Sequence, residues 1–332
     1  MRSSLQIVFV VAVFCLLATI ARGASEIVIA IRYLRAQGTS HSHLYLYRED
    51  GKLLRQLTKN NSGQDFAPIF SPDGETIVFA KETPNNVREF WSINPRGTNS
   101  KKLDTAPDWY AQAKSSPYFT NLGPQEADAT SSPAEVMSPT ATPVPTYKSP
   151  DGSFELILRE DPTDEDDQIN GPGHGKHYLL RDLKTGTATE FSKIPGFYGA
   201  AGLLHNNVNQ SQYFLFDGPL RLAFFDLHLN STDGDTVFAL NLTRPRLVRL
   251  SPNWATPIPL LGEPAFLTFT ENRYVPIPGS KKTANCSYME RWDDNLSKVR
   301  YGPDKAAALC YGASMYRPGK NPAVITIRRE AK

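Results

Sequence analysis

Two histidine pairs and one run of acids are the residues of this sequence whose types and spacing could hold a metal ion. His41 and His43 lie two positions apart, and His174 and His177 lie in a glycine-rich segment. Neither pair has a cysteine or a third histidine at the spacing that zinc sites use. The run from Asp161 to Asp167 carries five acids, but it lacks the spacing of an EF-hand calcium loop. We therefore predict solvated loop residues here and no metal site.

The sequence does not indicate a catalytic serine either. The Gly-x-Ser-x-Gly elbow of α/β-hydrolases is absent, because the nearest match, Gly312 to Tyr316, ends in tyrosine where the motif needs glycine. The sequence also has no glycine-rich phosphate loop. We therefore predict no catalytic, cofactor-binding or metal-binding residue.

The cysteines allow one covalent link. Cys15 lies in an apolar N-terminal segment that has the pattern of a cleavable export signal, so the mature chain would keep only Cys286 and Cys310. An even number of cysteines in an oxidising compartment permits a disulfide, which would stabilise the fold by roughly 3 kcal/mol in the chain-entropy model. We predict this disulfide, and the alternative is two buried thiols that pack as small apolar groups.

Residues 1–23 have the pattern of a cleavable export signal. Arg2 provides the positive start, Leu5 to Ile20 form an apolar run, and small residues precede Ala24. A retained transmembrane helix is the alternative, but the run is shorter than the roughly 20 apolar residues that cross a bilayer. We predict a mature domain over 24–332, a periplasmic or secreted location and no membrane span after cleavage.

The charge balance argues against polyanionic partners. The chain has 36 Lys and Arg against 34 Asp and Glu, and the signal segment removes two of the arginines, leaving 34 of each sign. Nucleic acids and anionic membranes select a strong basic excess or a concentrated basic patch. We therefore expect no nucleic-acid partner.

A four-strand pattern occupies residues 65–103. Asp65 to Ala80 has the pattern of a strand, a tight turn and a second strand, with Pro72 at the first central turn position and Gly74 at the left-handed one. Two more short alternating runs, 89–93 and 101–103, follow. The same order recurs in five candidate units, near 26–57, 66–103, 145–191, 198–250 and 255–301. C-terminal strands near 306–312 and 323–327 either complete the first unit or begin a sixth.

The repeated turn carries a family resemblance. Its two copies are Ser71, Pro72, Asp73, Gly74 and Ser149, Pro150, Asp151, Gly152. Together with the Leu-Tyr-Leu-Tyr hairpin that begins at Leu44, they resemble the WD40-like (PD40) propeller repeat of the TolB family. The clear match covers residues 26–103 and 145–191, and the turn signature is lost after 198.

That resemblance implies an all-β fold, a TolB-like β-propeller of five to six four-stranded blades. Radial stacking would cover blade faces that a single blade leaves exposed. A β-sandwich is the alternative, which the repetition of the whole unit disfavours. The pattern breaks at about 108–146, where a Pro/Ser/Thr-rich segment predicts a long inserted loop. This loop is either a surface linker or a partner-binding tail.

The resemblance also implies a function. It favours a protein-binding or scaffold module of the cell envelope, with an unidentified envelope or secreted protein as its partner and no cofactor. The alternative is a propeller hydrolase or lyase acting on a saccharide or lactone, which would require carboxylates and histidines that converge in the fold.

Overall fold

The structure, a computed structural model, describes residues 25–114, 146–149, 151–160, 176–191, 201–203, 214–217, 220–228, 235–251, 254–260, 263–302, 306–319 and 323–325. These residues form two compact units. Unit 1 contains the described residues of 1–124, 277–281 and 300–332, and unit 2 contains those of 125–276 and 282–299. The predicted signal, 1–23, lies outside the described residues. In the described part of the chain, no helix has the length and apolar character needed to cross a bilayer.

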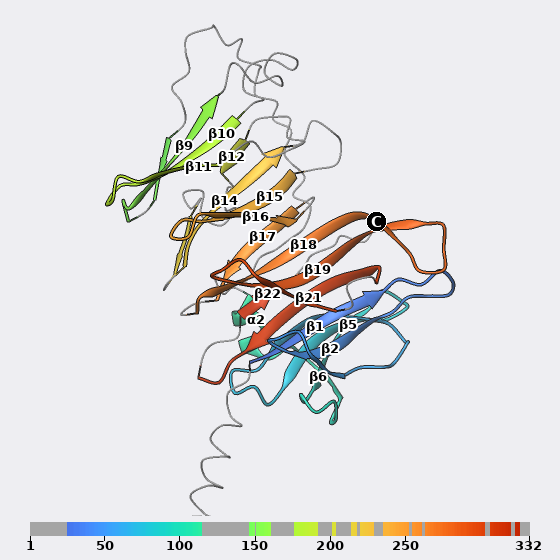
Figure 1. The fold of residues 1–332 in the computed structure, drawn as a ribbon. Coiled ribbons are helices and arrows are strands. Elements are labelled where there is room, and N and C mark those ends of the chain that lie inside the picture. The colour runs from blue at the N-terminus through green and yellow to red at the C-terminus, as the bar shows by residue number, and fades with distance from the viewer. Residues whose placement is uncertain are drawn as a thin grey trace, which may run out of the picture. The chain divides into compact units, whose positions relative to one another are not determined.

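Sheet A of unit 1 combines strands from both ends of the sequence. In spatial order its antiparallel strands are β22 (Ala323–Ile325), β21 (Ala308–Tyr316), β1 (Glu26–Tyr33), β2 (Ser42–Arg48) and β3 (Leu53–Gln56). The pairing of β1 with β21 runs from Glu26↔Tyr316 to Tyr33↔Ala308. Figure 1 shows these blue and red strands side by side. The C-terminal strands therefore complete the first predicted unit and do not begin a sixth.

Sheet B of unit 1 is formed by the second predicted unit. Its strands, in sequence and in space, are β4 (Gln64–Phe70), β5 (Ile77–Glu82), β6 (Arg88–Ile93) and β7 (Lys101–Leu103). The register between β4 and β5 shifts between Phe66 and Ile69, where Ala67 has a left-handed φ of 48°. A bulge of this kind bends the strand and leaves a main-chain group to be satisfied from outside the ladder.

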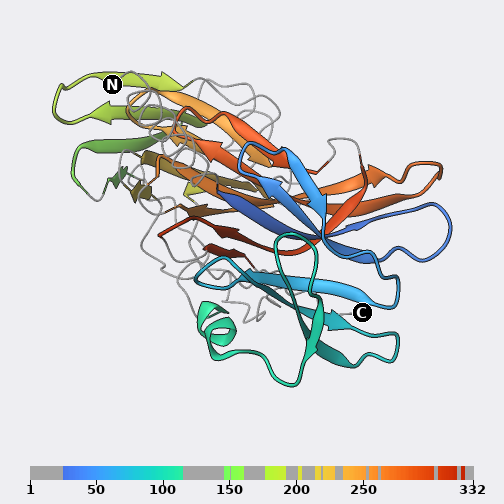
Figure 2. The ribbon, with the colours of Figure 1, turned by 90° about the horizontal axis from the view of Figure 1, so that it is seen from below.

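The helix α2 (Asp108–Lys114) satisfies that group. Tyr110 is buried, and its hydroxyl donates to the Ala67 carbonyl over 2.8 Å. Trp109 and Ala113 pack with it against the apolar side chains of sheet B, and Figure 2 shows the helix beside these strands. The start of the segment predicted as a loop is therefore helical, because these side chains share one apolar face. Residues 115–145 of that segment lie outside the described residues.

Sheets A and B pack face to face within unit 1. Buried aliphatic and aromatic side chains of both sheets form the shared core: Val28, Ala30, Leu44, Leu46, Phe70, Ile77, Phe79 and Ile93. The intervening residues of β1 and β5 are buried too, so these two strands are covered on both faces. Burying each larger side chain contributes roughly 1.5–3 kcal/mol. Ser314 adds a polar link, since its hydroxyl accepts the Phe70 N–H over 3.0 Å.

Unit 2 contains the other three sheets, apart from the last two residues of β20. Sheet C has the order β11 (Ala188–Phe191), β10 (Lys176–Asp182), β9 (Phe154–Glu160), β8 (Thr146–Lys148). Sheet D has the order β12 (Ala201–Leu203), β14 (Leu220–His228), β15 (Asp235–Asn241), β16 (Arg246–Ser251), and β13 (Phe214–Asp217) also pairs with β14. Sheet E has the order β17 (Trp254–Pro259), β18 (Ala265–Pro276), β19 (Thr283–Asp293), β20 (Lys298–Tyr301).

Sheets D and E share a buried core. Leu222 and Phe224 of β14 pack with Phe266 of β18 and Trp292 of β19, and the last two rings stack with their planes 6° apart. Each of the five predicted units therefore forms a sheet in the described part of the chain.

Candidate functional site

The first Ser-Pro-Asp-Gly motif forms a tight turn between β4 and β5. The Ser71 hydroxyl donates to Asp73 Oδ1 over 2.5 Å and accepts the Thr76 N–H over 3.0 Å. The Gly74 N–H donates to the Ser71 carbonyl over 2.9 Å, and Gly74 has a φ of 75°, which glycine adopts without steric cost. The motif therefore closes the hairpin, and its side chains are committed to the turn.

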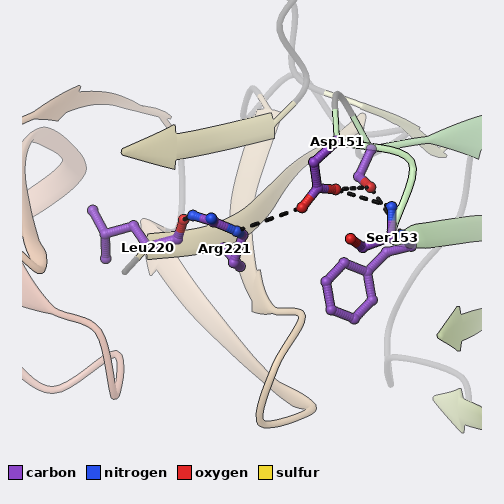
Figure 3. A network of polar contacts seen from close by, with 6 residues as sticks. Asp151, Ser153, Leu220 and Arg221 are labelled. Atoms are coloured by element: carbon purple, nitrogen blue, oxygen red, sulfur yellow. Dashed lines mark hydrogen bonds and ion pairs between the residues drawn. The ribbon is translucent and has the colours of Figure 1, made fainter. Parts of the chain in front are cut away.

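The second motif repeats this geometry between β8 and β9. The Ser149 hydroxyl donates to Asp151 Oδ1 over 2.8 Å and accepts the Phe154 N–H over 2.9 Å. Gly152 has a φ of 66°, and Pro150 lies outside the described residues. In addition to these hydrogen bonds the second turn makes an ion pair, shown in Figure 3, in which Asp151 Oδ2 lies 3.7 Å from Arg221 Nε of β14. This turn of sheet C thus contacts sheet D.

Cys286 belongs to unit 2 and Cys310 to unit 1, and the disulfide predicted between them stays a prediction. Both side chains are buried thiols, one on β19 and one on β21. Each Sγ lies 3.8 Å from a main-chain carbonyl two residues away, that of Ala284 or of Gly312. Each side chain is thus accommodated by local contacts within its own strand.

The motif residues considered for catalysis and metal binding are dispersed. Ser314 is buried and bonded to the main chain of β4, so its side chain serves the packing of the sheets. His177 lies in β10 opposite Arg159, whereas His174 and the acidic run 161–167 lie outside the described residues. Among the residues that the structure describes, no group of three or more His, Cys, Asp or Glu side chains is placed to hold a metal ion.

One end of unit 1 gathers charged residues that sequence reasoning did not connect. Antiparallel pairing brings the end of β1 beside the start of β2, and the start of β4 beside the end of β5. Ser42 joins these two hairpins, since its hydroxyl donates to the Asp65 carbonyl over 2.6 Å and its N–H to Gln64 Oε1 over 2.7 Å. We call this region the charged end of unit 1, formed by Arg32, Arg35, His41, His43, Asp65 and Lys81.

Asp65 is the acid of this region. It is 2% exposed, and the Thr58 hydroxyl donates to its Oδ2 over 2.5 Å. Burial raises the pKa of Asp65 to about 6, although Thr58, Lys81 and His41 each act to lower it. Asp65 therefore gains or loses a proton near pH 6, and raised pKa values of this kind are common for buried carboxyl groups at functional sites.

Lys81 is the buried cation. It is 8% exposed and lies opposite Asp65 in the register of β4 and β5. Its ammonium sits 5.4 Å from the centre of the Trp91 ring, within the range of a cation–π interaction. Glu89 lies opposite Lys81 on the other side, in the register of β5 and β6, and accepts from Lys102 and from the Trp91 indole N–H. The charge of Lys81 also helps to lower the pKa of Glu89, so Lys81 lies between two acids.

His43 is surrounded by positive groups. Burial lowers its pKa, an Asn61 hydrogen bond acts in the opposite direction, and the charges of His41, Arg35 and Lys81 lower it further. Its Nδ1 is buried and has no hydrogen-bond partner among the described residues, which is also true of Arg32 Nε. Buried polar atoms are normally paired, so an unpaired one suggests a missing ligand or water.

Unit 2 contains a buried charged group of a different kind. Glu290 of β19 is fully buried, and Lys298 donates to its Oε1 over 3.0 Å while the Thr270 hydroxyl donates to Oε2 over 3.1 Å. Lys298 also lies over the Trp292 ring, 5.1 Å from its centre. This carboxylate is paired on both oxygens, so the group stabilises sheet E and offers no open position.

No family model matches the sequence, and no curated protein matches it. Solved structures do match. TolB from Acinetobacter baumannii is 12% identical over 81% of this chain and 50% of its own, with a TM-score of 0.21. A putative TolB from Agrobacterium tumefaciens is 11% identical over 89% of this chain and 98% of its own, also with a TM-score of 0.21.

The propeller domain of the Trilobed protease from Pyrococcus furiosus is 10% identical over 90% of this chain and 76% of its own, with a TM-score of 0.20. This chain spans half the length of the Acinetobacter TolB. The solved structures to which the chain is similar are TolB and other β-propeller proteins, the class that its Ser-Pro-Asp-Gly turns predict.

Proposed function

We propose that this protein is an exported β-propeller of five blades that binds another protein of the cell envelope through the charged end of unit 1. The propeller is supported by the repeated four-strand units and by the C-terminal strands that complete sheet A. Export is supported by the signal pattern of residues 1–23.

One observation carries the choice of surface. The charged end of unit 1 holds buried polar atoms of Arg32 and His43 that have no partner among the described residues. Tyr311, whose hydroxyl lies 3.5 Å from Arg32 Nη1, and Trp91 beside Lys81 add aromatic surface. Arginine, tyrosine and tryptophan are the residues that dominate binding energy at protein interfaces. Strand ends on a rigid sheet scaffold are also where binding residues concentrate.

The test is capture of a partner from periplasmic extract by the purified mature protein, with metal analysis on the same sample. Three variants would be compared with the parent: Lys81→Gln, the exposed Arg35→Gln, and Lys101→Gln as a charge-matched control on β7. We expect one envelope protein to be captured by the parent and the control and lost with the first two variants. Capture by all four proteins alike, or by none, would contradict the proposal.

A second function is favoured by Asp65 alone. A carboxyl group with a pKa of about 6 beside a lysine suits a general acid or base, as a hydrolase or lyase acting on a saccharide or lactone requires. In that case activity on such substrates would show an inflection near pH 6 and would fall by about 10²-fold or more in Asp65→Asn, the usual size of a general acid–base contribution. Activity that is unchanged in Asp65→Asn would exclude this role.

A further inference from the structure

We infer that hydrogen bonds at the charged end of unit 1 form a pH-sensitive clasp between sheets A and B, with the Asp65 carboxyl as its titrating group. The clasp is closed more firmly when this carboxyl is protonated and opens more readily when it is ionised. The inference goes beyond the proposed function, because it concerns the protein alone and holds whatever the charged end binds.

The clasp joins the start of β2 in sheet A to the start of β4 in sheet B. The Ser42 hydroxyl donates to the Asp65 carbonyl over 2.6 Å, and the Ser42 N–H donates to Gln64 Oε1 over 2.7 Å. His41 Nδ1 lies 3.1 Å from the Gly63 carbonyl. Because each of these contacts joins a residue at the start of one sheet to a residue at the start of the other, their loss would separate the two hairpins at this end.

Thr58 connects the Asp65 carboxyl to the main chain of sheet A. Its hydroxyl donates to Asp65 Oδ2 over 2.5 Å and accepts the Leu44 N–H of β2 over 2.9 Å. A change of charge on the carboxyl therefore acts on a main-chain hydrogen bond of β2 through one hydroxyl group.

The Asp65 carboxylate lacks the pairing that a buried charge needs. Asp65 is 2% exposed, and in the described part of the chain its carboxyl receives one side-chain hydrogen bond, from Thr58, and takes part in no ion pair. Lys81 lies opposite Asp65 in the register, but its ammonium sits over the Trp91 ring, 5.4 Å from the ring centre. Burying a charge is costly unless it is paired and hydrogen-bonded, so the closed clasp favours the neutral carboxyl.

Glu290 in unit 2 provides the contrast. It is also fully buried, but Lys298 donates to one of its oxygens over 3.0 Å and the Thr270 hydroxyl donates to the other over 3.1 Å. Glu290 is thus held by an ion pair, whereas Asp65 is held by a neutral hydroxyl.

The other charged groups near the clasp do not remove this imbalance. Burial raises the pKa of Asp65 to about 6, and the lowering effects of Thr58, Lys81 and His41 do not outweigh it. Arg32 lies opposite Ser42 in the register of β1 and β2. Its Nη1 lies 3.5 Å from the Tyr311 hydroxyl.

The direction of the pH effect follows from these contacts. Opening of the clasp would return the Asp65 carboxyl to water, where an aspartate has a pKa of about 3.9. Below that value the carboxyl is protonated in both states and the clasp keeps its full stability. As the pH rises through the closed-state value of about 6, that stability is lost.

The test is amide hydrogen exchange of Ser42 and Leu44 in the full mature chain, followed by NMR at about pH 5 and about pH 7.5 and corrected for intrinsic exchange. The two pKa values predict a loss of protection of about tenfold over this interval. The Gly74 N–H, which is bonded to Ser71 in the turn at the other end of β4, is the internal reference and should show no such loss.

Two variants make the test specific. Asp65→Asn removes the titrating group, so the protection of Ser42 and Leu44 should no longer depend on pH. Asp104→Asn changes an exposed acid of unit 1 that follows β7, and it should keep the tenfold dependence of the parent. Protection that is independent of pH in the parent, or that changes equally in the parent and in Asp65→Asn, would overturn the inference.

A carboxyl NMR titration of the parent keeps the inference testable if Asp65→Asn does not fold. A midpoint for Asp65 near pH 6 that coincides with the loss of protection would support the clasp. A midpoint at or below the ordinary aspartate value of about 3.9 would overturn it. Neither measurement uses a partner, so failure here leaves the proposed function standing, and failed partner capture leaves the clasp standing.

Discussion

The two Ser-Pro-Asp-Gly turns have the same internal hydrogen bonds and different surroundings. In both turns the serine hydroxyl bridges the aspartate and a main-chain N–H, and the glycine has a left-handed φ. A Cβ added at Gly74 would lie 2.4 Å from the ring of Tyr316, whereas one added at Gly152 would meet no atom of the described residues within 4 Å. The motif therefore specifies the turn conformation, but the packing around each glycine decides how much stability its substitution would cost.

Replacing Gly74 should have the largest effect. Gly74→Ala places a Cβ in a left-handed conformation, at roughly 1–2 kcal/mol, and forces the Tyr316 ring away from Phe70, with which it now packs at 5.6 Å between ring centres. Overpacking adds roughly 1–3 kcal/mol. We expect the free energy of unfolding, measured in urea, to fall by about 2–5 kcal/mol. A change below about 0.5 kcal/mol would show that Tyr316 repacks freely.

Gly152→Ala is the matched substitution. It introduces the same backbone strain without a clash, so the loss should be roughly 1–2 kcal/mol and clearly smaller than that of Gly74→Ala. The same urea titration measures it. Equal losses for the two alanine variants would mean that backbone conformation alone accounts for both glycines.

The serines should behave alike. Ser71→Ala and Ser149→Ala each remove a hydroxyl that accepts one N–H and donates to one aspartate. Each should lower the free energy of unfolding by about 1 kcal/mol, the net value of a typical hydrogen bond. Chemical denaturation of the two variants in parallel provides the comparison. A difference of more than about 1 kcal/mol between them would contradict the equivalence of the turns.

The ion pair that distinguishes the second turn should have the smallest effect. Asp151 and Arg221 are 36% and 31% exposed, so Arg221→Gln should cost at most about 0.5 kcal/mol at pH 7. Burial alone would raise the pKa of Asp151, but the Ser153 N–H, the Ser149 hydroxyl and Arg221 together hold it below the ordinary value.

The sign of the pH dependence follows from that lowered pKa. Stability contributed by Asp151 is present above the ordinary aspartate pKa of about 3.9 and is lost as the pH falls through the lower folded-state value. The effect of Arg221→Gln should therefore disappear in strong acid. A carboxyl NMR titration should show the pKa of Asp151 rising in Arg221→Gln while that of Asp73, held down first by Ser71, stays unchanged. Movement of both values would indicate a general rather than a local effect.

Sequence reasoning succeeded where the structure depends on neighbours in the chain. Alternation and turn residues predicted five strand units, and each appears as a sheet in the described residues. It failed at α2, because proline-rich sequence downstream obscured the apolar face of Trp109, Tyr110 and Ala113. The predicted disulfide between Cys286 and Cys310 stays a prediction, since an even cysteine count says nothing about the distance between sulfurs.

The charged end of unit 1 illustrates the same limit. His41 and His43 were visible as a pair, but the approach of the β4–β5 hairpin, which carries Asp65 and Lys81, depends on the packing of one sheet against another. The raised pKa of Asp65 could not be predicted either, because it depends on burial between elements. The sequence did contain an indication of this charged end, since charged residues occur just where apolar strands begin and end.

By itself the sequence determined the strand units and the turns that join them, because the side-chain period of two and the needs of a tight turn are local properties. Only the tertiary structure decided that β21 and β22 join β1, that Tyr316 covers Gly74, and that positive groups surround His43. The physical reason is that burial and charge act between residues close in space, whatever their separation along the chain.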